Sequence, residues 1–367
     1  MTTARRRAAR PRARALRCGR ASSALAIACA LLAFLSAAAL APAARADNAL
    51  SYLTHVGLGQ LRLIRERQEL TPERIAALRP QEQEQLATLR RALLYGESQG
   101  LVHSTSYREL SDSGKPWLVQ VVTAAPANRM EPLTWWFPIV GSVSYRGYFD
   151  AERAKAFAAE LAGKGYDVYL RPSPLYSTLG WFDDPLPRPL LSWPVEDLVD
   201  TVIHEQVHAT VYVASDVAYD ENLATFVAHH ATLAFLADQP EAAERARAAF
   251  ADELTFAQLL NALRGELDAL YAAKPSPEQA RSERSPIFAR YQNEVYAAQS
   301  WRGDRFAGFK TLALSNAWLV GNRDYVGLAP CFERELASLG GDLPTFVRAH
   351  RERPGHRPEG CAEPQPH

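Results

Sequence analysis

The stretch Thr201-Val202-Ile203-His204-Glu205-Gln206-Val207-His208-Ala209 decides how this chain folds. It places the pattern His-Glu-x-x-His inside a run of apolar and β-branched residues, which predicts a helix. Pro194 opens the run, and acidic residues follow at positions 196 and 197. Proline and acidic side chains are both favoured in the first turn of a helix. We therefore expect the two histidines and Glu205 to lie on a helix that begins near Val195.

The spacing of the two histidines suits a metal site. Residues four apart on a helix share one face, with Cβ atoms about 5–6 Å apart. His204 and His208 can therefore reach one tetrahedral Zn²⁺ ion. Glu205 lies about 100° around the helix from His204, so its carboxylate can act on a water molecule without binding the metal. This arrangement predicts hydrolysis by zinc-activated water with Glu205 as the general base. The simpler alternative is a helix whose histidines only form hydrogen bonds.

A catalytic zinc site needs a third protein ligand and an open fourth position. Ala214 stands six residues after His208, where the metzincin arrangement has a histidine, so that class is excluded. The remaining candidates for the third ligand are Asp216, Asp220, Glu221, His229 and His230.

A helical hairpin selects among these candidates. We expect the first helix to reach about Val213, residues 214–216 to turn the chain, and a second helix to begin near Asp220. The antiparallel return then brings Glu221 back toward His208, with Asp220 as the helix cap. His229 and His230 follow about two turns later, which favours a position outside the ligand set.

The whole chain predicts an α+β fold dominated by helices. Residues 47–110 predict helices, one of them starting at Thr71-Pro72-Glu73. Short β-branched and aromatic runs at 117–125, 133–143 and 166–170 predict strands, and Asp150 caps a helix among them. These elements form a small β layer within residues 111–194, followed by a helical metal-binding part at 195–350. We interpret residues 47–350 as a single domain and residues 351–367 as a poorly ordered tail.

Charge is divided unevenly along the chain. Its 367 residues include 41 basic and 41 acidic side chains, but residues 1–46 hold nine arginines and no acidic residue. Residues 47–367 therefore carry 32 basic and 41 acidic side chains, a net charge of −9. An acidic body disfavours nucleic acid as a partner, because phosphate binding depends on clustered Lys and Arg.

Residues 1–46 are typical of a secretory signal peptide. An apolar run at 22–41 follows the arginines, and Ala44-Arg45-Ala46 offers small residues at a cleavage site. We expect an exported, periplasmic or secreted protein that meets a membrane only if the leader stays as an anchor or Cys29 carries a lipid. Cys331 and Cys361 remain in the body, where an oxidising compartment would let them pair; two free thiols are the alternative.

Several longer blocks resemble the bacterial "predicted aminopeptidase" group of exported zinc hydrolases. The blocks are Val122–Pro126, Trp136–Gly141, Tyr145–Phe149, Tyr176–Pro185, Ile203–His208 and Glu221–Val227, and the resemblance covers most of residues 50–350. It implies a zincin-like helical hairpin, with the downstream glutamate of gluzincin-like enzymes at Glu221. The chain departs from the group at Gln206-Val207, where Leu-Ala is usual, and at Asp220 and Asn222, which stand where Asn and Ser flank the glutamate.

The resemblance implies a peptide substrate, and further side chains must contact it. The developing oxyanion requires a hydrogen-bond donor besides the metal, and the candidates by residue type are Tyr145, Arg146, Tyr219 and His230. An aminopeptidase also binds the α-ammonium group of its substrate, typically with an acidic side chain. Asp183 and Asp184, just upstream of the zinc helix, are the candidates for that role.

Two other functions fit the same residues. The zinc ion would serve equally in an endopeptidase or a cell-wall amidase. A non-catalytic zinc-binding or assembly protein would need a fourth protein ligand to close the site, and His229 and His230 are the spare candidates.

Overall fold

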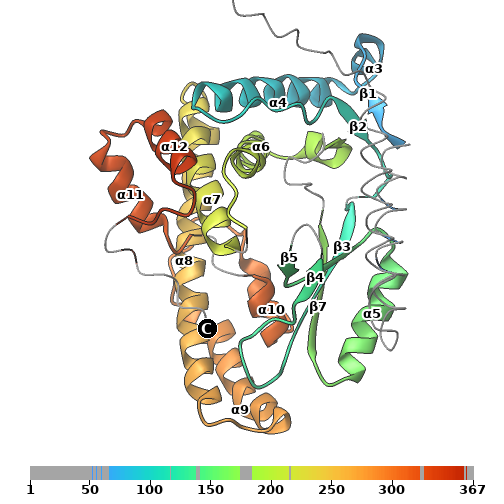
Figure 1. Ribbon diagram of the computed structural model, residues 1–367, viewed down its shortest axis with the longest axis vertical. Coiled ribbons are helices and arrows are strands. Elements are labelled where there is room, and N and C mark those ends of the chain that lie inside the picture. Colours follow the sequence, from blue (N-terminus) through green and yellow to red (C-terminus); the bar gives the residue numbers. More distant parts are fainter. Residues whose placement is uncertain are drawn as a thin grey trace, which may run out of the picture. The chain divides into compact units, whose positions relative to one another are not determined.

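The computed structural model describes residues 66–358 together with Tyr52, His55, Gly59 and Cys361 (Figure 1). Within 66–358, the residues not described are 116, 138–140, 174–183, 215 and 323–325. The leader expected at residues 1–46 lies outside the described residues. Residues 58–367 form one compact unit. No helix among the described residues is both long enough and apolar enough to span a bilayer.

Two helices lie near the start of the described part of this unit, and the second of them, α4, packs against the helices that carry the candidate metal ligands. Helix α3 (Pro72–Ala76) begins as the sequence predicts, with the Thr71 hydroxyl accepting a hydrogen bond from the Arg74 amide at 3.4 Å. Helix α4 (Pro80–Ser98) buries one apolar face. Strands β1 (Gln68–Glu69), β2 (Glu109–Ser111) and β8 (Leu186–Pro187) form a small sheet in the order β1-β2-β8.

A second small sheet occupies the middle of the chain. Strand β3 (Val119–Ala125) pairs antiparallel with β6 (Arg146–Tyr148) and β7 (Asp167–Ser173). All of β3 is buried, because α5 (Ala151–Gly163) and α10 (Asn316–Gly321) both pack against it. Asp150 caps α5 as predicted, accepting from the Glu152 and Arg153 amides at 2.9 and 3.0 Å.

The run at 133–143 divides into two strands. Strands β4 (Trp135–Phe137) and β5 (Gly141–Val143) pair antiparallel as a separate two-stranded sheet. Small sheets among many helices confirm the predicted helix-dominated α+β class.

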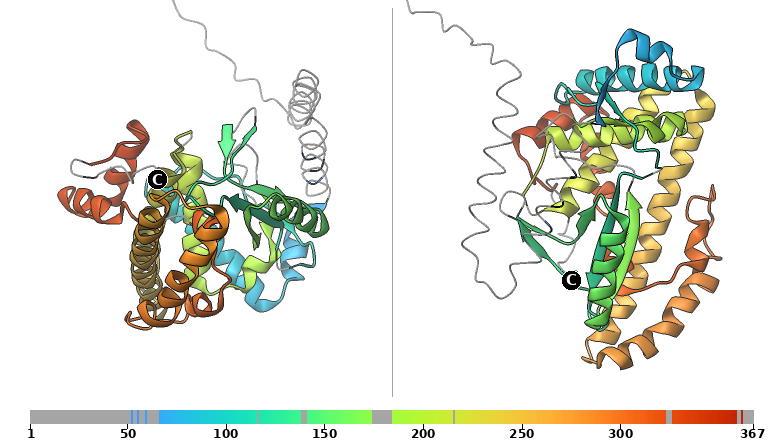
Figure 2. Two further views of the ribbon diagram at one scale, coloured as in Figure 1. Left: turned by 90° about the horizontal axis from the view of Figure 1, so that it is seen from below. Right: turned by 90° about the vertical axis from the view of Figure 1, so that its right-hand side faces the viewer.

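The second half of the chain is helical. Helices α6 (Val195–Thr210) and α7 (Val217–Phe235) form a hairpin, and the long α8 (Pro240–Tyr271) contacts both of them. Helix α6 runs beneath α4 both in Figure 1 and in the right-hand view of Figure 2, and the two helices are in contact. The later elements are α9 (Pro277–Arg290), a π-helical turn (Tyr291–Val295), a 3₁₀ turn (Ala307–Thr311), α10, α11 (Ala329–Ser338) and α12 (Leu343–Glu352).

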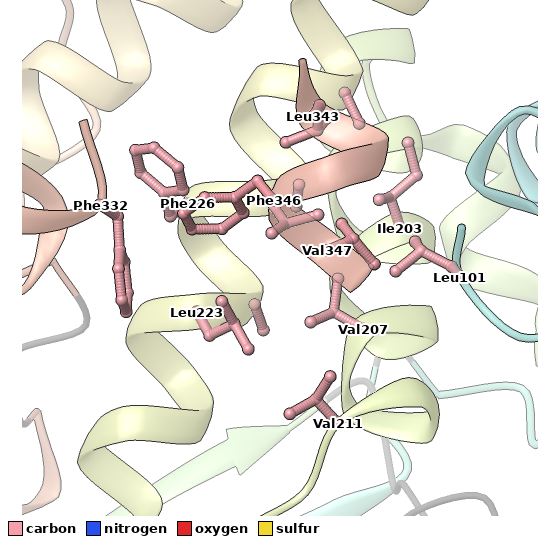
Figure 3. Close-up of a cluster of buried hydrophobic side chains, with 14 of the residues drawn as sticks. Leu101, Ile203, Val207, Val211, Leu223, Phe226, Phe332, Leu343, Phe346 and Val347 are labelled. Carbon is pink, nitrogen blue, oxygen red and sulfur yellow. The ribbon is translucent and has the colours of Figure 1, made fainter. Parts of the chain in front are cut away.

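Apolar side chains of the hairpin fix the orientation of α6. Figure 3 shows Ile203 and Val207 of α6 in one cluster with Leu223 and Phe226 of α7. Phe346 of α12 completes the cluster, and all five side chains are at most 2% exposed. Burying a side chain of this size contributes about 1.5–3 kcal/mol. Because Ile203 and Val207 point into this core, His204 and His208, each one residue later and about 100° around the helix, lie on the adjacent face of α6.

The turn between α6 and α7 differs from the prediction. Helix α6 ends at Thr210 rather than near Val213, because Val211 is extended and buried in the core. Helix α7 starts at Val217 with Asp216 as its cap, the carboxylate accepting from the Tyr219 amide at 3.1 Å. The expectation that Asp220 caps the second helix is therefore wrong. Asp220 instead accepts from the Val213 amide at 2.9 Å and closes the turn.

The C-terminal segment is attached at two points. Cys361 forms a disulfide with Cys331 of α11, with Cα atoms 5.9 Å apart. The Arg357 guanidinium lies 2.7 Å from the Asp216 carboxylate at the start of α7. Part of the region expected to be a loose tail thus holds the end of the hairpin that carries Glu221.

Candidate metal centre

Helix α6 brings two imidazole rings together on one face. The Nε2 atoms of His204 and His208 lie 3.0 Å apart, and the rings meet edge to face at an interplanar angle of 82°. The two rings are one helical turn apart, so the backbone alone sets most of this geometry. His208 is buried, whereas His204 is partly buried.

Helix α7 supplies a carboxylate to the same point. Glu221 Oε2 lies 3.3 Å from His204 Nε2 and 3.6 Å from His208 Nε2. The hairpin holds Glu221 there through the Asp216 cap and the hydrogen bond between Asp220 and Val213. Among the described residues, His204, His208 and Glu221 are the group of His, Cys, Asp and Glu side chains able to share a metal ion.

The spacing of these three atoms fits a tetrahedral ion. Two ligand atoms about 2.0–2.1 Å from a tetrahedral zinc ion lie about 3.3 Å apart. The three separations of 3.0, 3.3 and 3.6 Å lie around that value. Two imidazole nitrogens and one carboxylate oxygen are also ligands that Zn²⁺ accepts in open, catalytic sites.

One buried atom of this group has no hydrogen-bond partner. His208 Nδ1 is inaccessible to solvent and bonds to none of the described residues.

The Nε2 atoms of the two imidazole rings face one another. At most one of these two nitrogen atoms can carry a proton that the other accepts. A cation between the rings would satisfy both nitrogen lone pairs at once.

The electrostatics of the group favour a cation. Burial opposes the charged form of His204, but the hydrogen bond and charge of Glu221 outweigh it and raise the pKa of His204 to about 9. Burial also acts to raise the pKa of Glu221, yet the hydrogen bonds to both histidines bring it well below its usual range. Glu221 therefore stays ionised at neutral pH and keeps a negative charge beside the two rings.

Two carboxylates besides Glu205 and Glu221, on Asp200 and Glu253, lie near His204. Burial and the charge of Glu253 on α8 raise the pKa of Asp200, one turn before His204, to about 7. Burial likewise raises the pKa of Glu253. Arg305 partly balances them, lying 3.8 Å from Glu253 and 3.6 Å from Asp197. The four-residue spacing from Asp200 to His204 was available in the sequence, but nothing there pointed to Glu253 or Arg305.

The structure places two of the predicted oxyanion candidates elsewhere. Tyr219 is fully buried, and its hydroxyl lies 2.8 Å from His350 Nδ1 in the core. His230 pairs with Glu333 at 3.0 Å. The helix explains both positions: Tyr219 and His230 are two and nine residues from Glu221, which puts each of them about 160–180° around α7 from it.

Other candidates lie on the small sheets or in the approach to α6. Arg146 of β6 has its guanidinium 5.3 Å from the Trp135 ring and 4.8 Å from the Phe157 ring. Tyr145 is 51% exposed in the turn before it. Asp183 lies outside the described residues. Asp184 accepts a hydrogen bond from the Tyr107 amide at 2.7 Å through its carbonyl oxygen.

The spare histidine beside His230 also points away from the ligand group. His229 stacks on Phe250 with ring centroids 3.8 Å apart, and burial lowers its pKa to about 3. Neither His229 nor His230 belongs to the group of side chains that could share a metal. Within the described residues, no fourth His, Cys, Asp or Glu side chain joins the three candidate ligands.

At two positions where the chain departs from the family pattern, Gln206 and Asn222, a buried side-chain amide forms hydrogen bonds with backbone groups. The Gln206 side chain donates to the Val102 and Leu93 carbonyls at 2.8 and 3.3 Å, attaching α6 to the end of α4. The Asn222 side chain accepts from the Leu328 amide at 2.7 Å, attaching α7 to the start of α11. Both side chains therefore help to position the helices that carry the candidate metal ligands.

Comparisons with known proteins give one result. A family model described as "Putative aminopeptidase" matches residues 51–357, which include both larger sheets and the α6–α7 hairpin, and the match confirms the resemblance found in the sequence blocks. No curated protein and no solved structure matches the chain.

Proposed function

The chain belongs to the family described as "Putative aminopeptidase", and we propose that it is an exported, zinc-dependent aminopeptidase. In this proposal the α6–α7 hairpin is a zincin-like metal site. His204, His208 and Glu221 hold the zinc ion, and Glu205 is the general base. One observation carries the proposal: the three candidate ligand atoms converge at 3.0–3.6 Å with Glu205 on the same helix.

The chemistry divides between the ion and the chain. When bound, zinc supplies Lewis acidity, which lowers the pKa of water to about 7 and polarises a carbonyl group. The Glu205 carboxylate takes one proton from the attacking water as the water oxygen bonds to the carbonyl carbon. Glu205 then delivers this proton to the amine nitrogen as the carbon–nitrogen bond breaks. The carboxylate is ionised again at the end, and no covalent enzyme intermediate is required.

The surrounding charge supports an amine-bearing substrate. Asp200 and Glu253 lie near His204, Asp197 lies about one turn before Asp200 on α6, and Arg245 and Arg305 partly balance these carboxylates. In their ionised forms these carboxylates would attract the protonated amino terminus of a peptide. An endopeptidase, whose substrate is uncharged at the scissile bond, would gain nothing from such a charge.

Export is supported by two features of the chain. The arginine-rich and then apolar residues 1–46 are typical of a secretory leader. The Cys331–Cys361 disulfide requires an oxidising compartment to persist.

The experiment compares two kinds of substrate with the same metal-loaded protein. We expect one zinc ion per chain, hydrolysis of aminoacyl dyes, loss of activity on chelation and recovery on adding zinc. Internally quenched peptides with a blocked amino terminus should remain uncut. Cleavage of the blocked peptides would instead identify an endopeptidase, and a zinc-loaded protein inactive on both would indicate a non-catalytic role.

A further inference from the structure

Residues 353–358, which follow α12, return to the first turn of α7. Among them, the Arg357 guanidinium lies 2.7 Å from the Asp216 carboxylate and 5.7 Å from the centre of the Tyr219 ring. The Asp216 carboxylate that caps α7 is shared between two donors, because Oδ1 accepts from the Tyr219 amide and Oδ2 accepts from Arg357. The start of α7 is therefore attached to the C-terminal end of the chain.

The same residues reach the turn between α6 and α7. Gly355 has a φ of 80°, in the left-handed region that glycine adopts without strain. A Cβ atom at this position would lie 3.7 Å from both methyl carbons of Val213. The Val213 amide in turn donates to Asp220, one residue before Glu221, at 2.9 Å. Residues 353–358 thus contact the turn as well as the helix cap, the two features that precede Glu221.

A disulfide holds these residues in place. Cys361 is bonded to Cys331 of α11, and the Cys361 amide donates to the Pro358 carbonyl at 3.1 Å. Helix α11 is itself attached to α7, because the amide of its first flanking residue, Leu328, donates to Asn222 at 2.7 Å. The connection therefore runs from α7 through α11 and the disulfide back to the cap of α7.

Without the disulfide, little else would order this end of the chain. Residues 351–367 include four prolines and two glycines but no Val, Ile, Leu, Met, Phe, Tyr or Trp. Such a segment cannot bury enough apolar surface to offset the entropy lost on ordering. The ion pair between Arg357 and Asp216 is partly exposed, and an ion pair of this kind stabilises little by itself. The disulfide therefore decides how much of the time Arg357 lies beside Asp216.

We propose that residues 353–358, held by the disulfide, are a clamp that positions Glu221, so that zinc binds more tightly once Cys331 and Cys361 are oxidised. The inference rests on the proposed metal site, and Arg357 is a positioning residue that acts through the helix cap. Helix ends open readily, and a site that is competent for only part of the time has an apparent affinity reduced by that fraction. The clamp keeps the first turns of α7 closed.

The redox step is a thiol–disulfide exchange. The two thiols lose two protons and two electrons as their S–S bond forms, and a disulfide oxidant accepts them as its own S–S bond breaks to give two thiols. Oxidising compartments supply such oxidants, whereas the cytoplasm keeps thiols reduced. An exported chain would therefore complete its metal site only outside the cytoplasm.

Zinc affinity, measured by competition with a chelating dye, tests the clamp without an activity assay. We expect Arg357→Met and the double variant Cys331→Ser, Cys361→Ser each to weaken zinc binding by about 10-fold, the lower value for losing a residue that orients a metal ligand. Serine replaces chemical reduction because free thiolates bind zinc themselves. Arg357→Lys keeps the positive charge and should retain most of the wild-type affinity.

The matched control is Arg67→Met. Arg67 resembles Arg357 in being partly buried, in pairing with one carboxylate, that of Glu109 at 3.4 Å, and in having a buried Nε atom without a partner among the described residues. It lies beside β1 and away from α7. Its loss should change the melting temperature but alter zinc affinity by less than about twofold, as expected for an independent site.

A double-mutant cycle traces the effect to the cap. Asp216→Asn keeps a good capping residue but removes the ion pair, so it should weaken zinc binding about as much as Arg357→Met, and the two changes together should do no more. Wild-type zinc affinity in Arg357→Met or in the double serine variant, or an equal loss in Arg67→Met, would overturn the clamp and leave the metal site standing. A wild type that binds no zinc would overturn the proposed function itself.

Discussion

The Nε2 atoms of His204 and His208 lie 3.0 Å apart on one face of α6, and Glu221 of α7 approaches both of them. Two lone pairs and a carboxylate directed at one point repel one another unless a proton or a cation lies between them. The hairpin, its caps and the disulfide-attached C-terminal segment hold the three groups in this arrangement.

Removing the carboxylate should remove most of the zinc affinity. Glu221→Ala deletes one of the three proposed protein ligands and its negative charge. Loss of a residue that only hydrogen-bonds to a metal ligand lowers metal affinity by up to about 100-fold, so we expect the zinc affinity of this variant to fall by more than that. His230→Ala is the matched control on the same helix, because His230 pairs with Glu333 on the far side of α7. Competition with a chelating dye measures both. Equal losses in the two variants would contradict the assignment of Glu221.

Zinc should stabilise the fold. An ion that binds only the folded chain adds about 4 kcal/mol to the free energy of unfolding at a thousand times its Kd. Calorimetry of the chelated and zinc-loaded protein measures this gain as a higher melting temperature. Glu221→Ala should show little of the increase. A melting temperature independent of zinc in the wild type would argue against a site built into the folded hairpin.

The ion pair between Glu82 and Arg188 should make stability depend on pH. Glu82 of α4 is 1% exposed and lies 2.9 Å from Arg188, in the 3₁₀ turn (Arg188–Ser192) that precedes α6. Hydrogen bonds from Arg188 and then Arg79 lower the pKa of Glu82 from 4.5 to about 2. A carboxyl group whose pKa is lower in the folded than in the unfolded chain stabilises the fold at any pH above its unfolded-state pKa. This stabilisation is lost as the pH falls through the folded-state pKa.

Glu82→Gln should therefore cost about 3 kcal/mol at pH 7, from the size of this shift. The difference from wild type should shrink between pH 4.5 and about 2. Denaturant unfolding across that range is the measurement. Glu84→Gln, exposed on the same helix, is the control and should change stability by less than about 0.5 kcal/mol. If the loss of unfolding free energy in Glu82→Gln stayed constant down to pH 2, the ionisation of Glu82 would not be what couples stability to pH.

The disulfide should stabilise the chain through its unfolded state. Cys331 and Cys361 are 30 residues apart, and closing a loop of this length contributes about 3–4 kcal/mol. The double variant Cys331→Ser, Cys361→Ser should lower the denaturant midpoint by the corresponding amount. Reduction of the wild type should produce the same midpoint. An unchanged midpoint in reduced protein would show that the bridge adds no stability.

Much of the candidate metal centre could be predicted from the sequence because its geometry is local. The four-residue spacing of His204 and His208 specifies a shared face on any helix, and Pro194 with two acidic residues marks where that helix begins. The choice of Glu221 followed from the length of an antiparallel return. These relationships require only helix parameters, so they do not depend on the packing of the rest of the chain.

Relationships set by tertiary packing were not accessible. Asp216 and Asp220 are equally good caps by residue type, and only the burial of Val211 decides that α6 ends early and α7 begins at Val217. Glu253 approaches His204 from α8, and Tyr107 packs in one cluster with Leu198 and Val202 of α6 from a turn far upstream in the chain. No periodicity connects these residues, so the sequence did not identify them as neighbours of the site.

The most direct test of the central claim is the hydrolysis rate of Glu205→Gln at full zinc occupancy. Glutamine preserves the shape of the side chain and leaves His204, His208 and Glu221 in place, but it cannot accept a proton from water. We predict one zinc ion per chain in both proteins and a kcat for aminoacyl dyes about 10²–10⁴-fold lower in the variant, the usual contribution of a general base. A Glu205→Gln protein that binds zinc and hydrolyses these substrates at the wild-type rate would contradict the account.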